Sequence, residues 1–409
     1  MRILIMHSRY RSGSTSGENR VVEDEALVLS RGGHQVKLIS PTIADVSGLR
    51  LLATGGRVIW SSRAAAEVRL LLKKFRPDVV HCHNLFPALS PSVLRAVDGY
   101  APLIMTLHNY RLMCLPGILL RDGAICEDCV GRVPWPGILH ACYRKSRSAS
   151  LALATSLTLH AKLGTFDDVE LYIAISEFIR RKHIEAGILP QRVRVKPHFS
   201  WPLGRQERPG DYFLYLGRLS SEKGVRTLLQ AWRGVNLRLL IVGDGPEASY
   251  LRSEAPQQVE FRPSLPAAEA TALLRSARAV LIPSVSYEGA GRVVFEAYAA
   301  GVPVLASRVG GLPEYVKDGE TGLLLPPGNP EAWARAVDRL MDHKQRERMA
   351  NAGWNLWKTR YTPEHGLRGL VKAYEHAMLS SRQQRNTGGS SGRRERHAFY
   401  RGRVPERFA

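Results

Sequence analysis

Two loops in the second half of the sequence carry charged side chains where an apolar strand pattern ends. In the first, residues 214–216 lead into Gly217, and Arg218 and Lys223 flank the turn before the next helical pattern. The carboxyl end of a parallel strand, where a loop enters a helix N-terminus, attracts phosphate. Two cations there suit a diphosphate, although a Gly-Arg pair taken alone is also typical of a solvated surface turn.

The second loop follows the apolar strand pattern at residues 280–282. It contains Glu288, Gly289 and Gly291, and Glu296 lies in the helical pattern that comes next. A carboxylate can accept hydrogen bonds from two neighbouring hydroxyls, and glycine lets the backbone approach a ligand closely. A glutamate near a helix start can instead offset the helix macrodipole. The combination with the two glycines favours a site for a hydroxyl-rich ligand.

A cysteine-rich segment lies in the first half of the chain. The five cysteines are an odd number, which fits a fully paired disulfide framework poorly. Four of them fall in a segment with little periodic structure: Cys114, Cys126, Cys129 and Cys142. These thiols suggest a structural tetrahedral zinc site, with His140 able to replace one ligand, or else buried free thiols. Cys82 ends a strand pattern and is expected in the core.

A framework of alternating strands and helices must position these side chains. Strand patterns occur at residues 2–6, 35–40, 79–82, 103–107, 171–175 and 193–195, and again at 212–216, 237–242, 259–261, 280–282, 302–305 and 322–325. Helical patterns lie between them, for example at 18–30, 64–75, 176–186, 330–341 and 364–379. This alternation predicts parallel sheets. We expect an α/β fold of two doubly wound Rossmann-like domains.

The length of 409 residues supports two domains, because it exceeds what one ordinary core accommodates. Residues 201–210 are polar and rich in Pro and Gly, which marks them as the linker. We therefore expect an N-terminal domain at 1–200, with the cysteine insertion at 111–147, and a C-terminal domain at 211–357. C-terminal helices should follow at 358–380, and residues 381–409 should form a basic disordered tail.

Composition sets the expected location and partners. No apolar run approaches the roughly 18 residues of a membrane span, and the apolar residues 3–6 are too few for a signal peptide, so we expect a cytoplasmic protein. Lys plus Arg number 58 against 37 Asp plus Glu, which gives a net charge of +21. Such a chain is attracted to polyanions or anionic membrane surfaces. From Arg382 onward, eight arginines against two glutamates contribute +6 of this charge.

The motifs of the second half are similar to those of one enzyme family in order and spacing. Glu288 and Glu296, with seven residues between them and Ala297-Tyr298-Ala299-Ala300-Gly301-Val302-Pro303-Val304 behind them, resemble the signature of the family 4 retaining glycosyltransferases. The motifs that agree with it are Gly217-Arg218, Lys223-Gly224, Val242-Gly243-Asp244-Gly245-Pro246, Gly310-Gly311-Leu312-Pro313-Glu314 and Gly319-Glu320-Thr321-Gly322. The resemblance covers roughly residues 1–379.

The first half resembles the acceptor domain of the same family. The motifs that carry this part of the resemblance are Gly17-Glu18, Gly33-His34 and Thr106-Leu107-His108-Asn109. A subset of the family also has a cysteine-bearing insertion after the loop of His108. Two stretches depart from the family pattern: Lys196-Pro197-His198-Phe199-Ser200 replace the usual Asn-Gly-Val-Asp, and Arg262-Pro263 stand where Leu-Gly is common.

The resemblance implies the GT-B architecture, in which two Rossmann-like domains face each other across a cleft and the last helices return to the N-terminal domain. It implies that Arg218 and Lys223 bind the diphosphate of a nucleoside-diphosphate sugar. Glu296 would bind the ribose hydroxyls and Glu288 the transferred sugar. His108 would reach the sugar from the other domain, and the Gly17 loop would lie below the phosphates.

The chemistry that follows is sugar transfer to an acceptor hydroxyl. The nucleoside diphosphate leaves with growing negative charge, which Arg218, Lys223 and the helix start near Gly291 would stabilise. No Asp-x-Asp motif occurs, so we expect cationic side chains to do what Mg²⁺ does elsewhere and catalysis to need no metal. The resemblance implies front-face attack with retention of configuration.

The expected acceptor is a lipid-linked sugar or an oligosaccharide in cell-surface polysaccharide or glycolipid biosynthesis. The basic charge would hold the enzyme peripherally at the inner face of the membrane. Two alternatives stay open. One is a nucleotide-sugar epimerase or a phosphorylase on the same fold. The other is a basic nucleic-acid-binding protein with a zinc module, which the arginine-rich tail and the cysteines would suit.

Overall fold

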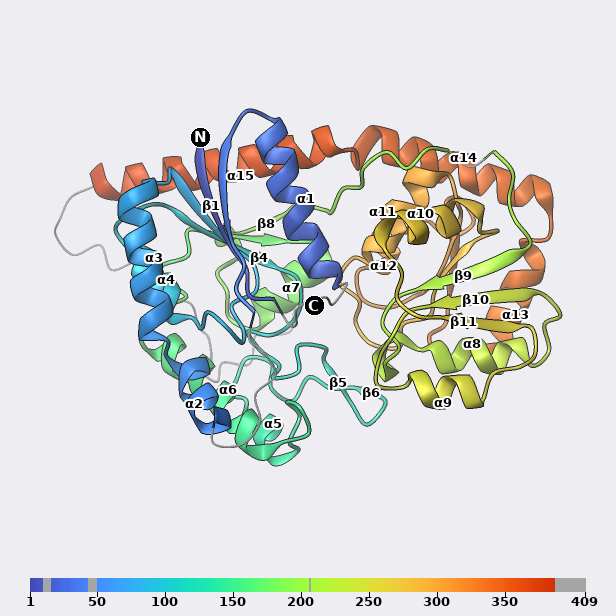
Figure 1. Ribbon diagram of the computed structural model, residues 1–409, viewed down its shortest axis with the longest axis horizontal. Helices are drawn as coiled ribbons and strands as arrows, with labels where there is room; N and C mark the ends of the chain where they lie inside the picture. The colour runs from blue at the N-terminus through green and yellow to red at the C-terminus, as the bar shows by residue number, and fades with distance from the viewer. Residues whose placement is uncertain (10–15, 43–49, 206, 387–409) are drawn as a thin grey trace, which may run out of the picture. The chain divides into compact units, whose positions relative to one another are not determined.

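The computed structural model describes residues 1–9, 16–42, 50–205 and 207–386 (Figure 1). These residues form two compact units. The first contains Met1–Leu119, Glu127–Lys196 and the described residues from Gly366 onward, and the second contains Leu120–Cys126 and Pro197–His365. Each unit has its own parallel sheet with helices on its faces. The expected α/β class with two doubly wound domains is thereby confirmed.

The sheet of the first unit has the strand order β2-β1-β3-β4-β7-β8, with every neighbouring pair parallel. Its strands are β1 (Arg2–Met6), β2 (Gln35–Ile39), β3 (Val79–Cys82), β4 (Leu103–Leu107), β7 (Leu171–Ala174) and β8 (Val193–Val195). Every residue of β3, β4 and β7 is buried. Strands that are buried along their whole length are typical of parallel sheets covered on both faces.

Eight helices are described for this unit or run into it. They are α1 (Gly17–Arg31), α2 (Arg50–Ile59), α3 (Ser62–Phe75), α4 (Ser92–Val97), α5 (Trp135–Leu139), α6 (Arg147–Lys162), α7 (Glu177–Glu185) and α15 (Pro363–Asn386), with a 3-10 turn η1 at Pro190–Arg192. Serine side chains cap α3, α6 and α7, because Ser61, Ser146 and Ser176 each accept a hydrogen bond from the backbone N–H three residues on.

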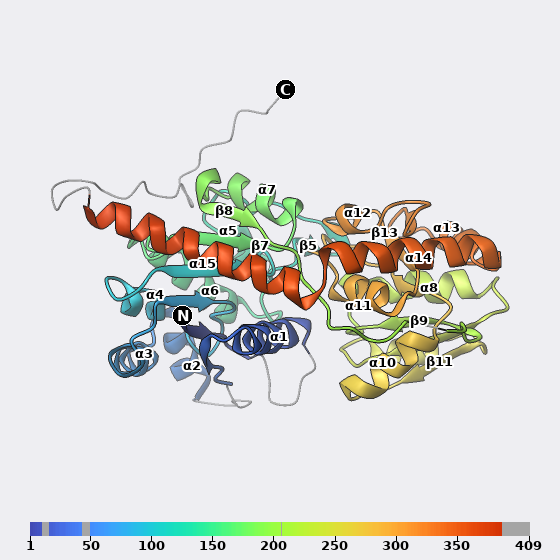
Figure 2. The same cartoon turned by 90° about the horizontal axis from the view of Figure 1, so that it is seen from above.

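The last helix, α15, belongs to the first unit from Gly366 onward and is the long red helix that lies along it in Figure 2. Its residues Leu370, Tyr374 and Ala377 are fully buried. The helix continues to Asn386, which corrects the expectation of disorder for residues 381–386. The rest of the arginine-rich tail, residues 387–409, lies outside the described residues.

The sheet of the second unit has the order β11-β10-β9-β12-β13-β14. Its strands are β9 (Tyr212–Leu216), β10 (Arg238–Val242), β11 (Val259–Arg262), β12 (Val280–Ile282), β13 (Val304–Ser307) and β14 (Gly322–Leu325). The strand pattern predicted at 302–305 begins two residues late. Gly301 ends the preceding helix with φ +68°, and Pro303 has no N–H to give to a sheet ladder.

Helices cover both faces of this sheet, as the yellow and orange part of Figure 1 shows. They are η2 (Ser221–Lys223), α8 (Val225–Trp232), α9 (Ala248–Ser253), α10 (Ala267–Ser276), α11 (Arg292–Ala300), α12 (Leu312–Tyr315), α13 (Pro330–Arg339) and α14 (His343–Arg360). On one face α8 packs against α13, and on the other α11 packs against α14. Trp232 and Trp333 are fully buried in the core between sheet and helices.

The small antiparallel hairpin of β5 (Leu120–Arg121) and β6 (Ala124–Ile125) lies within the cysteine-bearing insertion. Among the described residues, no helix is both long and apolar enough to cross a membrane.

Candidate functional site

The strand order of the second sheet reverses between β9 and β12. These two strands are neighbours, and the chain continues to β10 on one side and to β13 on the other. Ligands of doubly wound sheets bind beyond the carboxyl ends of the strands at such a reversal. The loop after β9 contains Gly217, Arg218 and Lys223, and the loop after β12 contains Glu288, Gly289 and Gly291. The topology thus brings the two predicted loops together.

Lys223 and Glu288 form an ion pair between these loops. The ammonium of Lys223 donates to both carboxylate oxygens of Glu288, at 3.0 Å to Oε1 and 2.8 Å to Oε2. The hydroxyl of Ser284 donates to the same Oε2 at 3.0 Å. The Glu288 carboxylate is therefore held by two side chains and orients the cation in turn.

The backbone around the pair explains why the loops approach so closely. The N–H of Val285 donates to the carbonyl of Glu222 at 3.0 Å, which joins the two loops next to Lys223. Gly224 follows with φ +67°, and a Cβ at this position would collide with the carbonyl of Pro283. Glycine is required here both by its conformation and by the contact.

The electrostatics of the pair keep both groups charged. Burial alone would lower the pKa of Lys223, but the Glu288 carboxylate outweighs burial and raises this pKa. Burial would raise the pKa of Glu288, but Lys223 and the Ser284 hydroxyl outweigh it and lower this pKa. The side chains are 31% and 16% exposed, so a polar ligand can still reach the ammonium.

Gly217 and Arg218 lie at the carboxyl end of β9, beside the end of β10. The N–H of Gly217 donates to the carbonyl of Val242 at 3.1 Å. A Cβ at Gly243 would collide with the Gly217 carbonyl, so the Val242-Gly243-Asp244-Gly245-Pro246 motif packs directly on the Gly217 loop. Arg218 is exposed, and its carbonyl accepts the hydroxyl of Tyr215 at 2.7 Å. Its backbone is anchored while its guanidinium faces outward.

Helix α11 begins directly after Gly291, which has φ +59°. Glu296 lies one turn into this helix and forms an ion pair with Arg292, at 2.9 Å between Nη2 and Oε1. The loop that follows β13 supports Glu288 from behind, because the N–H of Gly311 donates to the Glu288 carbonyl at 2.8 Å. Arg292 thus adds a cation to the start of α11, in addition to the two cations of the loop after β9, and it was not among the predicted site residues. Its spacing of four residues from Glu296 is the signal that could have predicted the ion pair.

The strand order of the first sheet also reverses, between β1 and β3, and histidines gather at the carboxyl end of β3 and its neighbours. His108, just beyond β4, contacts His83, just beyond β3, with 2.8 Å between His108 Nε2 and His83 Nδ1. His83, His108 and Asn109 line one small pocket with Phe86 and Arg111.

Gly17 is the first residue of α1, and open space surrounds the position that a Cβ would occupy. The next residue, Glu18, accepts a hydrogen bond from the Asn109 amide at 2.6 Å. This contact brings the start of α1 to the loop of His108. Two of the predicted first-unit site residues, Gly17 at the start of α1 and His108 in the loop after β4, therefore lie on segments that contact each other.

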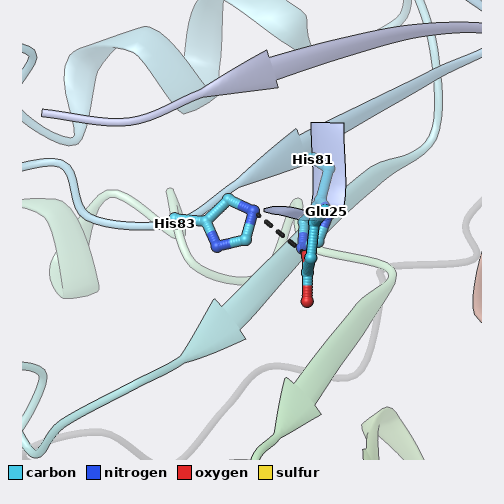
Figure 3. Close-up of side chains that lie close together, drawn as sticks. All are labelled: Glu25, His81 and His83. Atoms are coloured by element: carbon cyan, nitrogen blue, oxygen red, sulfur yellow. Dashed lines mark ion pairs between the residues drawn. The ribbon is translucent and has the colours of Figure 1, made fainter. Parts of the chain in front are cut away.

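A buried polar cluster lies behind His108 and was not predicted. The carboxylate of Glu25 accepts from the ammonium of Lys196 at 2.6 Å, and its other oxygen lies 3.7 Å from Nε2 of His83. His81 is buried beside them (Figure 3). The alternation His81-Cys82-His83 at a strand end was a visible signal. Glu25 lies in the acidic run Glu23-Asp24-Glu25 of a helix, a pattern that is usually typical of a solvated face.

The cysteines of the insertion differ in burial. Cys114 is buried, whereas Cys126, Cys129 and Cys142 are partly exposed. Within the described part of the chain, the group of three potential metal ligands with donor atoms within 4.8 Å of one another is Glu25, His81 and His83, and the cysteines do not form such a group. The zinc site stays a prediction. Cys82 is in the core as expected, and burial raises the pKa of its thiol.

Known proteins match both halves of the chain. Residues 15–199 match the family described as Glycosyltransferase Family 4, and residues 203–355 match Glycosyl transferases group 1. A phosphatidyl-myo-inositol mannosyltransferase of Mycobacterium leprae is 31% identical over 358 residues, which are 80% of this chain and 84% of that protein. The chain belongs to glycosyltransferase family 4.

Solved structures agree with this assignment at the level of the fold. The structure of Anabaena HepE in complex with UDP and glucose has a TM-score of 0.63 at 18% identity, and the match covers 93% of this chain and 100% of that one. Sucrose-phosphate synthase of Thermosynechococcus elongatus has a TM-score of 0.68 at 17% identity, with 92% and 99% covered.

This glycosyltransferase is therefore an enzyme of a retaining family with two Rossmann-like domains, as its motifs implied. The comparisons give no support to an epimerase, a phosphorylase or a nucleic-acid-binding protein.

Proposed function

We propose that this glycosyltransferase takes its sugar from a nucleoside-diphosphate sugar bound at the strand-order reversal of the second sheet. The observation that carries the proposal is the Lys223 ammonium, held by Glu288 at 2.8 Å beside the start of α11. A cation fixed in place before the reaction stabilises a charge that develops on the leaving group without reorganising. The UDP complex of Anabaena HepE, a protein of the same fold, agrees with this ligand class.

Each predicted site residue of the second unit has a proposed role in binding the donor. Lys223 and the exposed Arg218 bind the diphosphate, together with the N–H groups at the start of α11. The backbone of Gly217, Gly289 and Gly291 permits close approach of the phosphates. Glu288 orients Lys223 and hydrogen-bonds hydroxyls of the transferred sugar, while Glu296 accepts from the ribose hydroxyls.

In the first unit, His108 is proposed to contact the transferred sugar, and the loop at Gly17 to lie near the phosphates. We assign no metal ion to the reaction, because the cationic side chains stabilise the negative charge that develops on the leaving group. The proposed acceptor is a lipid-linked sugar or oligosaccharide used for glycolipid or cell-surface polysaccharide synthesis. The Mycobacterium leprae relative, by its name a mannosyltransferase acting on a phosphatidylinositol, supports an acceptor of this type.

A thermal-stability panel of nucleoside diphosphates and their sugars tests the donor proposal. The right ligand at one hundred times its dissociation constant should raise the free energy of unfolding by about 2.7 kcal/mol. Lys223→Met should lose most of this gain. Arg233→Met is the matched control, because Arg233 is an exposed cation of the same unit that pairs with Glu254 away from the site.

The outcomes separate clearly. Stabilisation of the wild type and of Arg233→Met, but not of Lys223→Met, supports the site. Equal stabilisation of all three proteins would place the nucleotide elsewhere. No stabilisation by any member of the panel would overturn the donor class.

A further inference from the structure

Four side chains form a continuous line of polar contacts that starts at the lining of the first-unit pocket. His108 Nε2 lies 2.8 Å from His83 Nδ1, His83 Nε2 lies 3.7 Å from Glu25 Oε2, and Glu25 Oε1 accepts from Lys196 Nζ at 2.6 Å. The side chains of His83 and Glu25 are 0% and 2% exposed. The line runs from a pocket-lining imidazole to a buried ion pair.

The charges along this line are well defined. Burial, together with the charge of Lys196, lowers the pKa of His83 well below its ordinary value, and burial also lowers the pKa of His108. Both imidazoles are therefore neutral at pH 7 and carry one N–H each. Burial opposes the charge on Glu25, but the ammonium of Lys196 outweighs it and lowers the Glu25 pKa, so this group is a carboxylate.

Only one of the two imidazoles can supply the hydrogen in their shared contact. If His83 donated through Nδ1, its bare Nε2 lone pair would face the anionic Oε2 of Glu25, an unfavourable contact in a buried site. If His108 donates through Nε2, the Nε2–H of His83 points at that oxygen instead. Neither Glu25 Oε2 nor His83 Nε2 has a hydrogen bond elsewhere, so the second arrangement serves both.

We propose that Glu25 and His83 are positioning residues that fix the tautomer and ring orientation of His108. His108 then carries its proton on Nε2, and its Nδ1 is a hydrogen-bond acceptor, the type of group that meets a sugar hydroxyl. Lys196 holds Glu25 in place, and α15 supports Lys196, since Gly369 lies against its side-chain stem. The inference rests on the proposed function only where it assigns His108 to the sugar.

A metal ion is the competing explanation for Glu25, His81 and His83, whose donor atoms lie within 4.8 Å of one another. Two observations oppose it. The ammonium of Lys196 already forms an ion pair with the Glu25 carboxylate and would repel a metal cation. Both nitrogens of His81 are engaged, Nδ1 with the Tyr374 hydroxyl at 2.9 Å and Nε2 with Thr106 Oγ1 at 2.7 Å.

The tautomer of His108 can be measured directly on the full chain without substrate. Nitrogen-15 NMR of protein labelled at the histidine ring nitrogens distinguishes a protonated from a bare nitrogen, and the His108→Gln variant assigns the His108 signals by their loss. The expected result is a protonated Nε2 and a bare Nδ1. A protonated Nδ1 on His108 would overturn the inference.

Three further variants separate positioning from a merely structural role. Glu25→Gln should shift His108 to a mixture of tautomers. This should lower kcat/KM roughly 10-fold, which is the loss expected when one hydrogen bond between neutral groups is no longer correctly oriented. Glu25→Asp keeps the carboxylate and should restore the wild-type tautomer. Tyr374→Phe is the matched control, because it removes a hydrogen bond from the same cluster without touching His83 or His108.

The results have distinct meanings. An unchanged His108 tautomer in folded Glu25→Gln protein, or an equal tautomer shift in Tyr374→Phe, contradicts the positioning role. A bound metal that disappears in Glu25→Gln protein would show a metal site instead. If the tautomers behave as expected but His108→Gln transfers sugar at the wild-type rate, the positioning stands and the proposed contact of His108 with the sugar fails.

Discussion

Lys223 is the residue on which transfer should depend most. It sits at the strand-order reversal with its ammonium oriented by Glu288, and its charge matters most when the diphosphate leaves. Lys223→Ala should therefore lower kcat by roughly 100- to 1000-fold, the usual loss for one preorganised charge-stabilising donor. Donor-saturation kinetics measure this, with circular dichroism to confirm folding. A normal kcat with only a raised donor KM would refute the charge-stabilising role.

Glu296 should behave differently, because ribose contacts are similar in the ground state and the transition state. Glu296→Gln is expected to raise the donor KM with little change in kcat. Its ion pair with Arg292 is about one-quarter exposed on the glutamate side, so the fold should tolerate the change. If kcat falls as far as in Lys223→Ala and KM does not rise, Glu296 acts on the chemical step.

The residues of the second-unit site were predictable, because motif spacing and strand ends place Lys223 and Glu288 in loops that the topology must bring together. The first-unit cluster was not. Glu25 and Lys196 are 171 positions apart in the sequence, and no local pattern links a glutamate in a helix with a lysine beyond the last strand of that sheet. Lys196 departs from the family pattern, but the sequence alone does not show that Glu25 is its buried partner.

At the scale of elements, the cysteine insertion makes a prediction about metal. If Cys114, Cys126, Cys129 and Cys142 bind zinc, the purified protein should contain one equivalent, and Cys129→Ser should lower both the zinc content and the free energy of unfolding. Elemental analysis and urea unfolding measure the two quantities. Protein of normal stability that contains no zinc would mean that these cysteines are free thiols.

Helix α14 shows where element prediction stopped. Its sequence is mostly polar, and its buried residues Met349, Gly353 and Trp357 recur only every four positions. Gly353 faces Tyr298 of α11, where a Cβ would lie 2.6 Å from the ring. A glycine inside a helix lowers the local helical signal, yet here it lets two helices approach. The strands were easier to predict from the sequence, because their apolar runs are nearly continuous.

At the scale of the whole molecule, buried neutral histidines should make the fold sensitive to acid. Burial lowers the pKa of His81 and of His183 from 6.5 to about 4. Between these values the unfolded chain binds a proton that the folded protein does not, so stability is lost as the pH falls from 6.5 towards 4. Each of the two residues can remove up to about 3 kcal/mol.

Urea unfolding at pH 7.5, 6 and 5 measures this loss. His183→Asn can still donate to the Ile179 carbonyl, which His183 Nδ1 contacts at 2.8 Å, and should reduce the slope by about 1.4 kcal/mol per pH unit. His343→Asn, at an exposed helix position, is the control for the loss of a surface histidine. Identical slopes in all three proteins would show that His183 is not kept neutral by folding.

The net charge of +21 predicts binding to anionic membranes. Vesicles with anionic lipids should bind the enzyme at low salt, and removal of residues 387–409, with six arginines and two glutamates, should weaken binding at least 10-fold, since each basic residue near the surface contributes about 1 kcal/mol. Sedimentation with vesicles measures it. Equal binding to neutral and anionic vesicles would contradict peripheral attachment by charge.

The hydrogen bond between His81 and Tyr374 also bears on how the protein is made. It joins a strand near the start of the chain to its last helix, 293 residues later. At about 5–20 residues per second, a ribosome needs roughly 15–60 s to cover that interval. The first unit cannot complete its core until α15 has been synthesised, whereas every residue of the second unit precedes Gly366 in the chain. The first unit should therefore be the later of the two to complete its fold during synthesis.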